Sequence, residues 1–428
     1  MRMIISSALP LSKSGYGNQT LYMVYGLLLQ NIQIPALICW NVNSTNIIKD
    51  VNKPHKFKNI VNIFFPNKEN NAILKLREFI PDISDEIIEK FGEINIYPVL
   101  SNDWSEGNYK IKDAFLFNLI SMKENCKTMI FHQDVFCYQH LKNKFEFKSF
   151  IFAPLHYYPL DKQSKEGLKH FDELIGMSDF GCKLLEDNFT DKPLHKIGLC
   201  VDTNLSNLEH DKSYYKNLLG FSDNHFVCTM ITNNAESTDR KAFFQNLRAF
   251  SKLQKKHKNA RLYIHSSVSK QIDLLGILRR FKVKSKFYKF SDQIKFNNHL
   301  YSREDVFNIL KGSDVLLSAS KSEGFGIPIL EAQCCGCPVV TTNFSAMPEL
   351  TVNGITTEYK DTEPYPDDKN SYWAIPDINN IFKALELIYN WPPIKRTEMK
   401  KKGIEFSKQF SCDIIAKKII DLCNNVST

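Results

Sequence analysis

The sequence predicts an α/β protein made of two doubly wound domains that face each other across a cleft. The chain has 428 residues, more than a single hydrophobic core usually serves, so we expect two domains. Residues 3–40 read as strand, loop, helix and strand, and residues 226–266 repeat that order. Short apolar runs alternate with helical segments between and beyond these units, which is typical of parallel sheets covered on both faces.

The composition is that of an ordinary folded protein. Hydrophobic residues make up 43% of the chain and charged residues 24%. The net charge of +8 favours an anionic ligand but is far below that of a dedicated nucleic-acid binder. The 11 cysteines are odd in number and several lie in apolar runs, which indicates reduced thiols and a cytoplasmic location. The apolar start is too short for a signal peptide and no run of about 18 apolar residues occurs, so we expect no membrane span, while peripheral membrane contact stays open.

The first half should form the N-terminal domain, residues 1–205. A loop containing Gly15 and Gly17 should lead into a helix over residues 18–30, and "LKHFDELIGMS", residues 168–178, should also be helical. The segment 206–224 is polar and charged, so we place the domain boundary there. The expected strands of this half are residues 3–8, 34–40, 59–65, 94–100, 126–132 and 149–155.

The second half should form the C-terminal domain, residues 206–400. It opens with a strand over 226–231, a polar loop, a helix over 240–256 and a strand over 261–266. Two later strands are expected, "DVLLSAS" at 314–320 and "CPVVTT" at 337–342. The remaining residues, 401–428, belong to a helix over about 400–424 that we expect to cross back to the N-terminal domain.

The stretch "SASKSEGFGIPILEAQCCGCPVV", residues 318–340, contains the main candidate site. Glu323 follows a predicted parallel strand, and ligands of open α/β sheets bind at that end of the strands. The glycines that follow allow unusual backbone angles, and Pro328 suits the first turn of a helix that stops near Gly336. The helix N-terminus would offer unpaired N–H groups to a phosphate or a sugar. Two acidic residues, Glu323 and Glu331, would then flank one pocket. In the alternative interpretation, Glu331 only stabilises the helix dipole and Glu323 is a surface residue.

Three cysteines, Cys334, Cys335 and Cys337, follow Glu331. Their C-C-x-C spacing has no matching cysteine or histidine pair nearby, so zinc is disfavoured and we expect no metal site. Small buried packing residues are the preferred interpretation.

The residues "SEGFGIPILEAQCCGCPVV" resemble the E-x7-E signature of retaining glycosyltransferases with the GT-B fold, in particular the GT4 family. The resemblance covers most of residues 220–350. It implies two Rossmann-like domains. It also implies that Glu323 lies beside the donor sugar and that Glu331 holds the ribose hydroxyls, because an ionised carboxylate is a strong acceptor. The backbone that approaches the sugar and the phosphate would be that of Gly324, Phe325, Gly326 and Ile327.

The segment "TNNAESTDRKAFFQNL" gives the second landmark of the resemblance. It implies that Arg240 and Lys241, at the start of a helix, neutralise the nucleoside diphosphate. Many relatives separate these two residues by several positions, whereas here they are adjacent. The alternative is an ordinary basic helix start exposed to water.

The N-terminal half contributes candidates that also depend on the resemblance. The loop with Gly15 and Gly17 would reach the phosphate or the acceptor; a dinucleotide fingerprint would need glycine at the position of Thr20. His132 would contact the donor sugar, with Asp134 as its neighbour, although a lone histidine after a strand is more often structural. His156 could face the acceptor.

The segment "RRFKVKSKFYKF", residues 279–290, interleaves basic and aromatic residues. Such a run could follow a nucleic acid, but its position between a helix and a strand favours a solvated edge.

The resemblance implies a retaining transfer of sugar from a nucleoside diphosphate donor, UDP- or GDP-linked, to a hydroxyl of a glycan, protein or lipid. It needs no cofactor and no metal, because basic residues stabilise the leaving diphosphate. Three alternatives stay open: an epimerase of nucleotide sugars, a non-catalytic sugar-nucleotide or glycan-binding module, and a transferase with a nucleic-acid acceptor.

Overall fold

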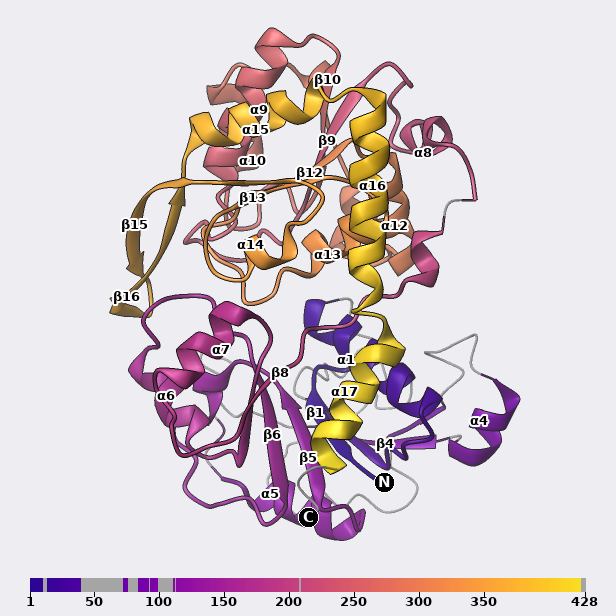
Figure 1. The fold of residues 1–428 in the computed structure, drawn as a ribbon, viewed down its shortest axis with the longest axis vertical. Helices are drawn as coiled ribbons and strands as arrows, with labels where there is room; N and C mark the ends of the chain where they lie inside the picture. Colours follow the sequence, from indigo (N-terminus) through magenta and orange to yellow (C-terminus); the bar gives the residue numbers. More distant parts are fainter. Residues whose placement is uncertain are drawn as a thin grey trace.

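The computed structural model describes residues 1–10, 14–39, 72–75, 84–91, 93–98, 111, 113–207 and 209–424. Two α/β domains lie one above the other along the long axis of the molecule, each built around its own largely parallel sheet (Figure 1). The predicted fold class is therefore confirmed. The expected strand over 59–65 lies outside the described residues.

The N-terminal sheet has the strand order β3-β4-β2-β1-β5-β6-β7-β8 in the described residues. All neighbouring strands run parallel except β3, which is antiparallel to β4. The strands are β1 (Ile4–Ser7), β2 (Ala36–Cys39), β3 (Ala72–Lys75), β4 (Glu93–Pro98), β5 (Thr128–His132), β6 (Lys148–Ala153), β7 (Glu173–Gly176) and β8 (Leu194–Lys196). The helices are α1 (Gly15–Leu29), α4 (Asp85–Phe91), α5 (Phe115–Lys123), α6 (Lys162–Leu168) and α7 (Asp179–Glu186), with short 3-10 turns η3 (Val135–Tyr138) and η4 (Asn204–Ser206).

The C-terminal sheet has the order β11-β10-β9-β12-β13-β14, and every pairing is parallel. The order reverses between β9 and β12, so the ends of these two strands form the switch point at which open α/β sheets bind ligands. The strands are β9 (Phe226–Ile231), β10 (Ala260–His265), β11 (Tyr288–Phe290), β12 (Val315–Ser318), β13 (Val339–Thr342) and β14 (Ile355–Thr357). The helices are α8 (Lys212–Leu218), α9 (Phe243–Lys256), α10 (Leu274–Arg280), α11 (Gln293–Asn297), α12 (Arg303–Gly312), α13 (Ile327–Cys334), α14 (Met347–Leu350) and α15 (Ile378–Tyr389), with the 3-10 turn η5 (Ser285–Phe287).

The end of the chain forms two helices where the sequence predicted one. Helix α16 (Pro393–Lys408) packs on α13 of the C-terminal domain, and α17 (Cys412–Asn424) packs on α1 of the N-terminal domain (Figure 1). The chain turns between them because Val201 donates its N–H to the carbonyl of Phe410 at 2.8 Å, which ties the turn to the strand-like linker between the domains. The C-terminal segment therefore packs against both domains.

The prediction of a helix over residues 168–178 was wrong. Helix α6 ends at Leu168, and the residues from Glu173 to Gly176 form the buried strand β7. Glu173 can be buried in this strand because Lys148 and His195 each contact its carboxylate at 2.7 Å. A long-range pair of partners thus lets an acidic residue occupy a strand.

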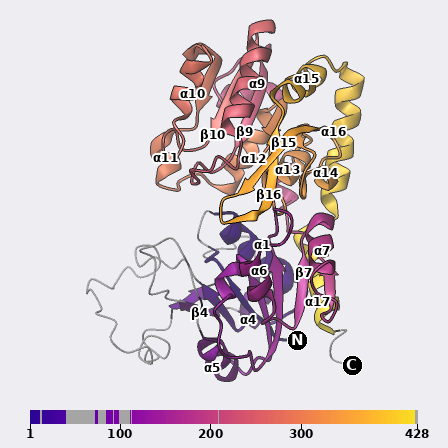
Figure 2. The same cartoon turned by 90° about the vertical axis from the view of Figure 1, so that its left-hand side faces the viewer.

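A two-stranded antiparallel arm, β15 (Tyr359–Tyr365) and β16 (Asp368–Pro376), was not predicted. Its proline and charged residues obscure the alternation that marks a strand. The arm leaves the C-terminal domain and reaches the N-terminal one (Figure 2). There Tyr372 donates its N–H to the carbonyl of Tyr158 at 2.7 Å and accepts the N–H of Tyr158 at 3.1 Å. The arm is therefore a direct backbone link between the domains.

Among the described residues, no helix is both long and apolar enough to cross a lipid bilayer.

Gly26 lets α1 and α17 approach each other closely, because a Cβ at this position would collide with the carbonyl oxygen of Cys412. Gly26→Ala should lower the free energy of unfolding by about 1–3 kcal/mol, since overpacking outweighs the ~1 kcal/mol better helix propensity of alanine. The midpoint of urea denaturation measures the effect. Leu29→Ala, at an exposed position of the same helix, is the matched control, and an unchanged midpoint for Gly26→Ala would contradict the prediction.

Candidate functional site

The loop between β12 and α13 presents Glu323 at the carboxyl end of the central strand, as the sequence predicted. Gly326 has φ of +104°, a backbone angle that favours glycine, and it precedes the helix without any side-chain cap. Pro328 lies in the first turn of the helix. The N–H of Glu323 is donated to Ser345 Oγ at 2.9 Å, and this bond fixes the position of the acidic residue.

The Glu323 carboxylate is buried, with 8% of the residue exposed, and it is fully occupied by donors. Lys241 Nζ lies 2.7 and 3.0 Å from its two oxygens, and Arg240 Nη1 lies 3.3 Å from Oε2. Ser320 donates its hydroxyl to Oε1 at 2.7 Å. Burial alone would raise the pKa of Glu323, but Lys241 and Arg240 lower it to about 2. The group is therefore ionised at neutral pH.

Arg240 and Lys241 lie in the loop before α9, not in the helix as predicted. The helix begins at Phe243 because the Asp239 carboxylate accepts the N–H of Phe243 at 2.8 Å. Asp239 and Ala242 have φ of +51° and +50°, and each left-handed non-glycine residue costs on the order of 1–3 kcal/mol. This strained turn aims both basic side chains at Glu323.

The two basic residues differ in their electrostatics. Burial lowers the pKa of Lys241, and the charge of Arg240 adds to this, while Glu323 opposes it. Burial also acts to lower the pKa of Arg240, but the carboxylates of Glu323 and Glu236 outweigh it and raise the pKa. Arg240 is therefore always protonated, whereas the protonation of Lys241 depends more on its surroundings.

Glu236 is a site residue that the sequence reasoning missed. It accepts hydrogen bonds from Arg240 Nε at 2.9 Å and from Nη2 at 2.7 Å, so Arg240 bridges Glu236 and Glu323. The spacing of four residues between Glu236 and Arg240 was the available signal, but in a loop it does not by itself bring the side chains together.

Glu331, in the second turn of α13, has its own cation. It is 2% exposed and forms an ion pair with Arg303, the first residue of α12. Arg303 Nε in turn donates to the hydroxyl of Tyr22 on α1 at 3.2 Å, which links this residue to the N-terminal domain. Burial raises the pKa of Glu331 although Arg303 works to lower it. Arg303 and Tyr22 carry no motif signal, so the sequence could not assign them.

The glycines of the N-terminal half are in a helix and not in a loop. Gly15 and Gly17 form the first turn of α1, where Ser14 is the N-cap and its Oγ accepts the N–H of Gly17 at 3.1 Å. That N–H is therefore already used within the cap. A Cβ on Gly15 would lie 3.7 Å from Ile327 Cδ1, so the start of α1 faces the start of α13 across the domain interface.

His132 ends β5 and is buried, whereas Asp134, two residues later, is half-buried. Burial lowers the pKa of His132 to about 3, so the imidazole is neutral. Its Nδ1 lies 3.4 Å from Ser7 Oγ, and its ring centroid lies 4.8 Å from that of Tyr16. Tyr16 donates its hydroxyl to Asp134 at 2.7 Å, and burial raises the pKa of Asp134.

His156 joins the two domains beside Glu323. Its Nδ1 lies 3.0 Å from Ser322 Oγ, and a Cβ on Gly324 would lie 3.1 Å from the backbone of Pro154. Burial, followed by the charge of Arg240, lowers the pKa of His156 to about 3. The neutral ring therefore contacts the loop that carries Glu323, and a role of His156 towards an acceptor stays a prediction.

The cysteines after Glu331 are free and buried. Cys334, Cys335 and Cys337 lie in the hydrophobic core, and burial raises the pKa of each thiol. Over the part of the chain that the structure describes, no group of three or more metal-ligating side chains is close enough to hold an ion.

The basic segment 279–290 covers the end of α10 and the edge strand β11. Two strands, β10 and β9, separate this edge from β12 in the sheet.

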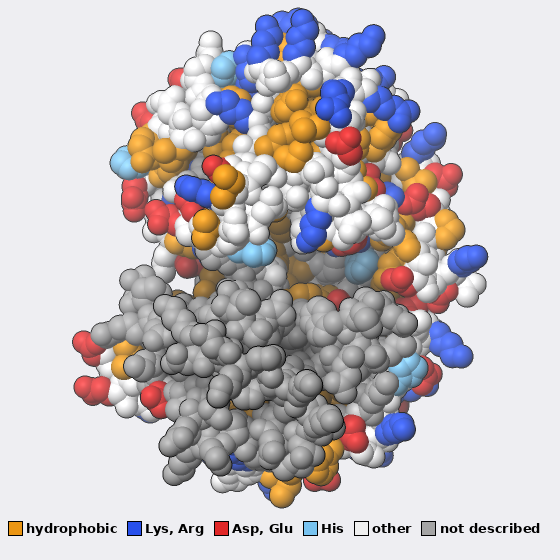
Figure 3. Space-filling model, turned by 180° about the vertical axis from the view of Figure 1, so that it is seen from behind, with side chains coloured by type: hydrophobic (Ala, Val, Ile, Leu, Met, Phe, Trp, Pro, Cys, Tyr) orange, Lys and Arg blue, Asp and Glu red, His pale blue; other side chains and the backbone are white. Residues whose placement is uncertain are grey.

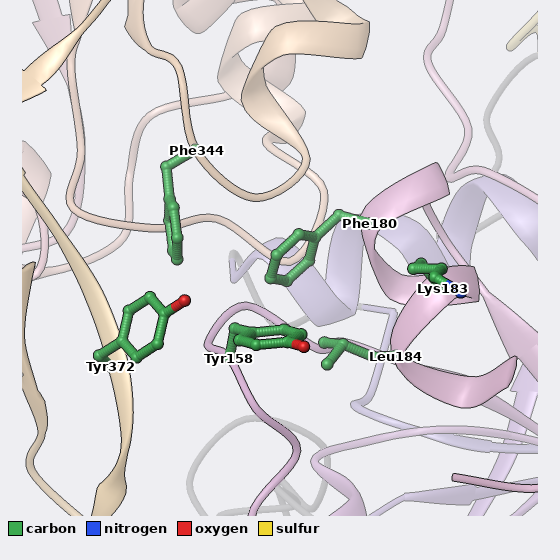
Figure 4. A pocket seen from close by; sticks show the side chains of 6 residues that line it. All are labelled: Tyr158, Phe180, Lys183, Leu184, Phe344 and Tyr372. Carbon is green, nitrogen blue, oxygen red and sulfur yellow. The ribbon is translucent and has the colours of Figure 1, made fainter. Parts of the chain in front are cut away.

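A hollow lies between the domains on the face opposite to that of Figure 1 (Figure 3). A separate interdomain cavity has a volume of about 280 Å³, with Phe344 and Tyr372 from the C-terminal domain opposite Tyr158 and Phe180 from the N-terminal one (Figure 4). Its lining is mostly aromatic, with Lys183 and Leu184 completing it, and does not include Glu323 or Lys241.

Comparison with solved structures decides the fold. Sucrose-phosphate synthase from Thermosynechococcus elongatus superimposes with a TM-score of 0.67 over 100% of this chain and 99% of that one, at 13% identity. WaaG, a glycosyltransferase of lipopolysaccharide biosynthesis, gives 0.62 over 99% of both chains at 11% identity. Anabaena HepE, in complex with UDP and glucose, gives 0.60 over 99% and 100% at 12% identity. The chain has the GT-B fold.

Sequence comparison points to the C-terminal domain. Residues 230–365, less than half of the chain, match the family model "Glycosyl transferases group 1". A D-inositol 3-phosphate glycosyltransferase of Saccharomonospora viridis is 36% identical over 67 residues, 15% of this chain and 16% of that protein. Putative glycosyltransferase 48 of a Sulfolobus islandicus filamentous virus is 30% identical over 153 residues, 34% and 48% respectively. The matched segments thus span less than half of these curated relatives.

Lys241 and Glu323 should be energetically coupled. Lys241→Met leaves a buried carboxylate with fewer partners and should destabilise the protein by about 3 kcal/mol. Glu323→Gln combined with Lys241→Met should cost less than the sum of the single changes, with a coupling of about 1–3 kcal/mol. Urea denaturation of the four proteins measures this cycle, and additive effects would show that the ion pair contributes nothing.

Acid should destabilise the protein through His132 and His156. Both pKa values are about 3 in the folded chain and near 6.5 when unfolded, so the unfolded state binds more protons below pH 6.5. The stability from each neutral histidine is complete above pH 6.5 and is lost as the pH falls towards 3, by about 1.4 kcal/mol per pH unit.

His132→Gln should flatten the dependence of the urea midpoint on pH between 6 and 5, above the range in which Glu323 gains a proton. His140→Gln, at an exposed position, is the control. An unchanged slope for His132→Gln would refute the assignment.

Proposed function

We propose that this protein is a retaining glycosyltransferase of the GT4 type, which transfers a sugar from a nucleoside diphosphate donor to an acceptor hydroxyl. The observation that carries the proposal is the buried Glu323 carboxylate held by Lys241 and Arg240 at the switch point of the C-terminal sheet. The match of residues 230–365 to the group 1 family model supports the reaction class. One structural neighbour, Anabaena HepE, forms a complex with UDP and glucose, and this supports a UDP-linked donor over a GDP-linked one.

The leaving group would be a nucleoside diphosphate, and its negative charge has ready partners. Arg240 can offer its planar fork and Lys241 a point charge to the phosphates. The start of α13, which no side chain caps, adds the N–H of Ile327; Pro328 has no N–H, and Ile329 donates its own to the carbonyl of Gly326 at 2.9 Å. Preorganised charges of this kind usually provide the largest part of catalysis. These fixed cations can do the work that a divalent metal does elsewhere, so the proposal is a metal-independent reaction without a cofactor.

Glu323 and Glu331 would hold the rest of the donor. When the diphosphate takes over Lys241 and Arg240, the Glu323 oxygens become free to accept sugar hydroxyls and to stabilise positive charge at the anomeric carbon. Glu331 would accept ribose hydroxyls in exchange for part of its contact with Arg303. The neutral His132 can donate one hydrogen bond and accept another, which suits a sugar hydroxyl.

The acceptor hydroxyl would attack on the face from which the diphosphate leaves. The bond from the anomeric carbon to phosphate oxygen breaks, the new glycosidic bond forms, and the acceptor proton passes to the leaving phosphate. No protein nucleophile is required. The domains meet at Ser322, Gly324 and His156, so closure there would exclude water and suppress hydrolysis of the donor. The acceptor class is a glycan, a protein or a lipid.

A donor panel tests the proposal. UDP- and GDP-linked sugars are incubated with the protein, and both transfer and slow hydrolysis are followed by release of free nucleotide. At least one donor should be consumed, and Lys241→Met and Glu323→Gln should each lower the rate by about 10²–10³-fold, as loss of one preorganised charge does. Lys255→Met, at an exposed position on α9, is the control and should retain the rate.

The remaining outcomes separate the rival functions. No consumption of any donor would exclude the enzyme. A free epimerised nucleotide sugar would indicate an epimerase. Donor binding in a thermal shift assay without turnover would indicate a binding module, and transfer only when DNA or RNA is added would indicate a nucleic-acid acceptor.

A further inference from the structure

A second cavity, of about 480 Å³, opens at the opposite end of the C-terminal sheet from Glu323. Phe226 begins β9, Asp314 precedes β12 and Pro338 precedes β13, and all three line this cavity. Helices α8 and α16 also contribute side chains to its lining. Glu323 follows the carboxyl end of β12, so the length of the sheet separates the cavity from the candidate active site.

The lining is strongly cationic. Lys212, Lys216, Arg396 and Lys400 all line the cavity, and among its described lining residues Asp314 is the single acidic one. Asp314 is fully engaged: Lys212 contacts Oδ1 at 2.8 Å, Lys216 contacts Oδ2 at 3.0 Å, and Val227 donates its N–H to Oδ2 at 2.8 Å. The Asp314 carboxylate is therefore the acidic partner for four cations, and its oxygens are already occupied by Lys212, Lys216 and the N–H of Val227. It leaves Arg396 and Lys400 without a counter-ion in this lining.

Three of the four cations are held in place by contacts other than a counter-ion. Lys216 is 5% exposed and donates to the carbonyls of Asp223 and His225 at 3.1 and 2.7 Å. Arg396 donates to three backbone carbonyls at the end of α15 and lies over the ring of Phe226. The stem of Lys400 packs on Gly336, where a Cβ would collide with it. The positive charges cannot move apart easily.

Lys400 has no acceptor of its own. Among the described residues, none forms a hydrogen bond or an ion pair with its ammonium group, although this side chain is only partly exposed. Burial and the charge of Lys212 lower the pKa of Lys400. Positive charges that are held close together repel one another, and a bound anion would relieve this repulsion.

We propose that this cavity is a binding site for a phosphate-bearing small molecule, separate from the donor site. Phosphate oxygens would lie between Lys400, Lys212 and Arg396, the arrangement of convergent cations that recognises phosphate. The volume exceeds that of a phosphate group alone and suits a small ligand. Asn224 and Tyr389, which also line the cavity, provide amide and aromatic surface for an organic part such as a sugar or a base.

The test compares the melting temperature in sodium pyrophosphate and in sodium chloride of equal ionic strength. Pyrophosphate at about 100 times its dissociation constant should raise the melting temperature of the wild-type chain by several degrees. Lys400→Met and Lys212→Met/Lys400→Met should lose most of this rise. Lys401→Met/Lys402→Met, which removes two exposed lysines from the same helix, is the matched control and should keep it.

Folding of the variants is checked in chloride alone, where Lys400→Met should melt at or above the wild-type temperature because it removes a repelled charge. The melting temperature is then measured with inorganic phosphate, a hexose 1-phosphate and a nucleoside monophosphate, to identify which kind of phosphate compound binds. For each compound, a rise in melting temperature that Lys400→Met abolishes supports the proposal.

Three results would overturn the proposal. The first is a rise in pyrophosphate that Lys400→Met retains but Lys241→Met loses, because pyrophosphate then binds at the donor site. The second is no rise beyond that in chloride. The third is binding to anionic phosphatidylglycerol vesicles that depends on Lys400 without any response to pyrophosphate, because the lysines then form a membrane surface.

Discussion

The buried carboxylate of Glu323 is the interaction on which the C-terminal site depends. A carboxylate that loses water pays several kcal/mol unless cations and donors replace the solvent. Here Lys241, Arg240 and Ser320 replace it. The same acidic residue donates its N–H to Ser345. The loops after β9, β12 and β13 are therefore joined through one residue, and Lys321 donates its N–H to the carbonyl of Arg240 at 2.8 Å. Three separate loops become one rigid edge.

This edge is coupled to the N-terminal domain at several points. His156 contacts Ser322, Gly324 touches the backbone of Pro154, and Arg303 bridges Glu331 to Tyr22. The β15–β16 arm adds another contact, because Ala374 donates its N–H to the carbonyl of Lys321 while Tyr365 stacks on Tyr157 at 4.1 Å. A ligand that displaces Arg240 or Arg303 from its carboxylate therefore alters contacts between the domains. Any ligand that binds at this edge is therefore expected to affect the position of the domains.

The sequence was informative where local rules decide the structure. Strands with continuous apolar runs, such as β9 and β12, were predicted to within a residue or two, and the position of Glu323 followed from the end of a parallel strand. The sequence was not informative where residues far apart in the chain determine the structure. Glu173 can occupy a buried strand only because Lys148 and His195 come to it from other strands. Glu236 and Arg303 carry no motif, so their roles emerge only once the chain has folded. The GT4 assignment and the site roles came from resemblance and stay predictions.

Asp314 and Glu323, two of the buried acidic residues of the C-terminal domain, lie at opposite ends of its sheet and differ in the backbone around them. Asp314, at one end, is balanced by two lysines and also accepts the N–H of Val227, so its main effect is to hold β9 beside β12. Around Glu323, at the other end, the chain adopts unfavourable angles: three of the seven described non-glycine residues with positive φ are Asp239, Ala242 and Ser345. Strain of on the order of 1–3 kcal/mol per residue persists only where the surroundings impose it, and it gathers at sites of function. A carboxylate that served stability alone could be balanced without such strain, as Asp314 is. The strained loops around Glu323 therefore favour a binding role for that end of the sheet.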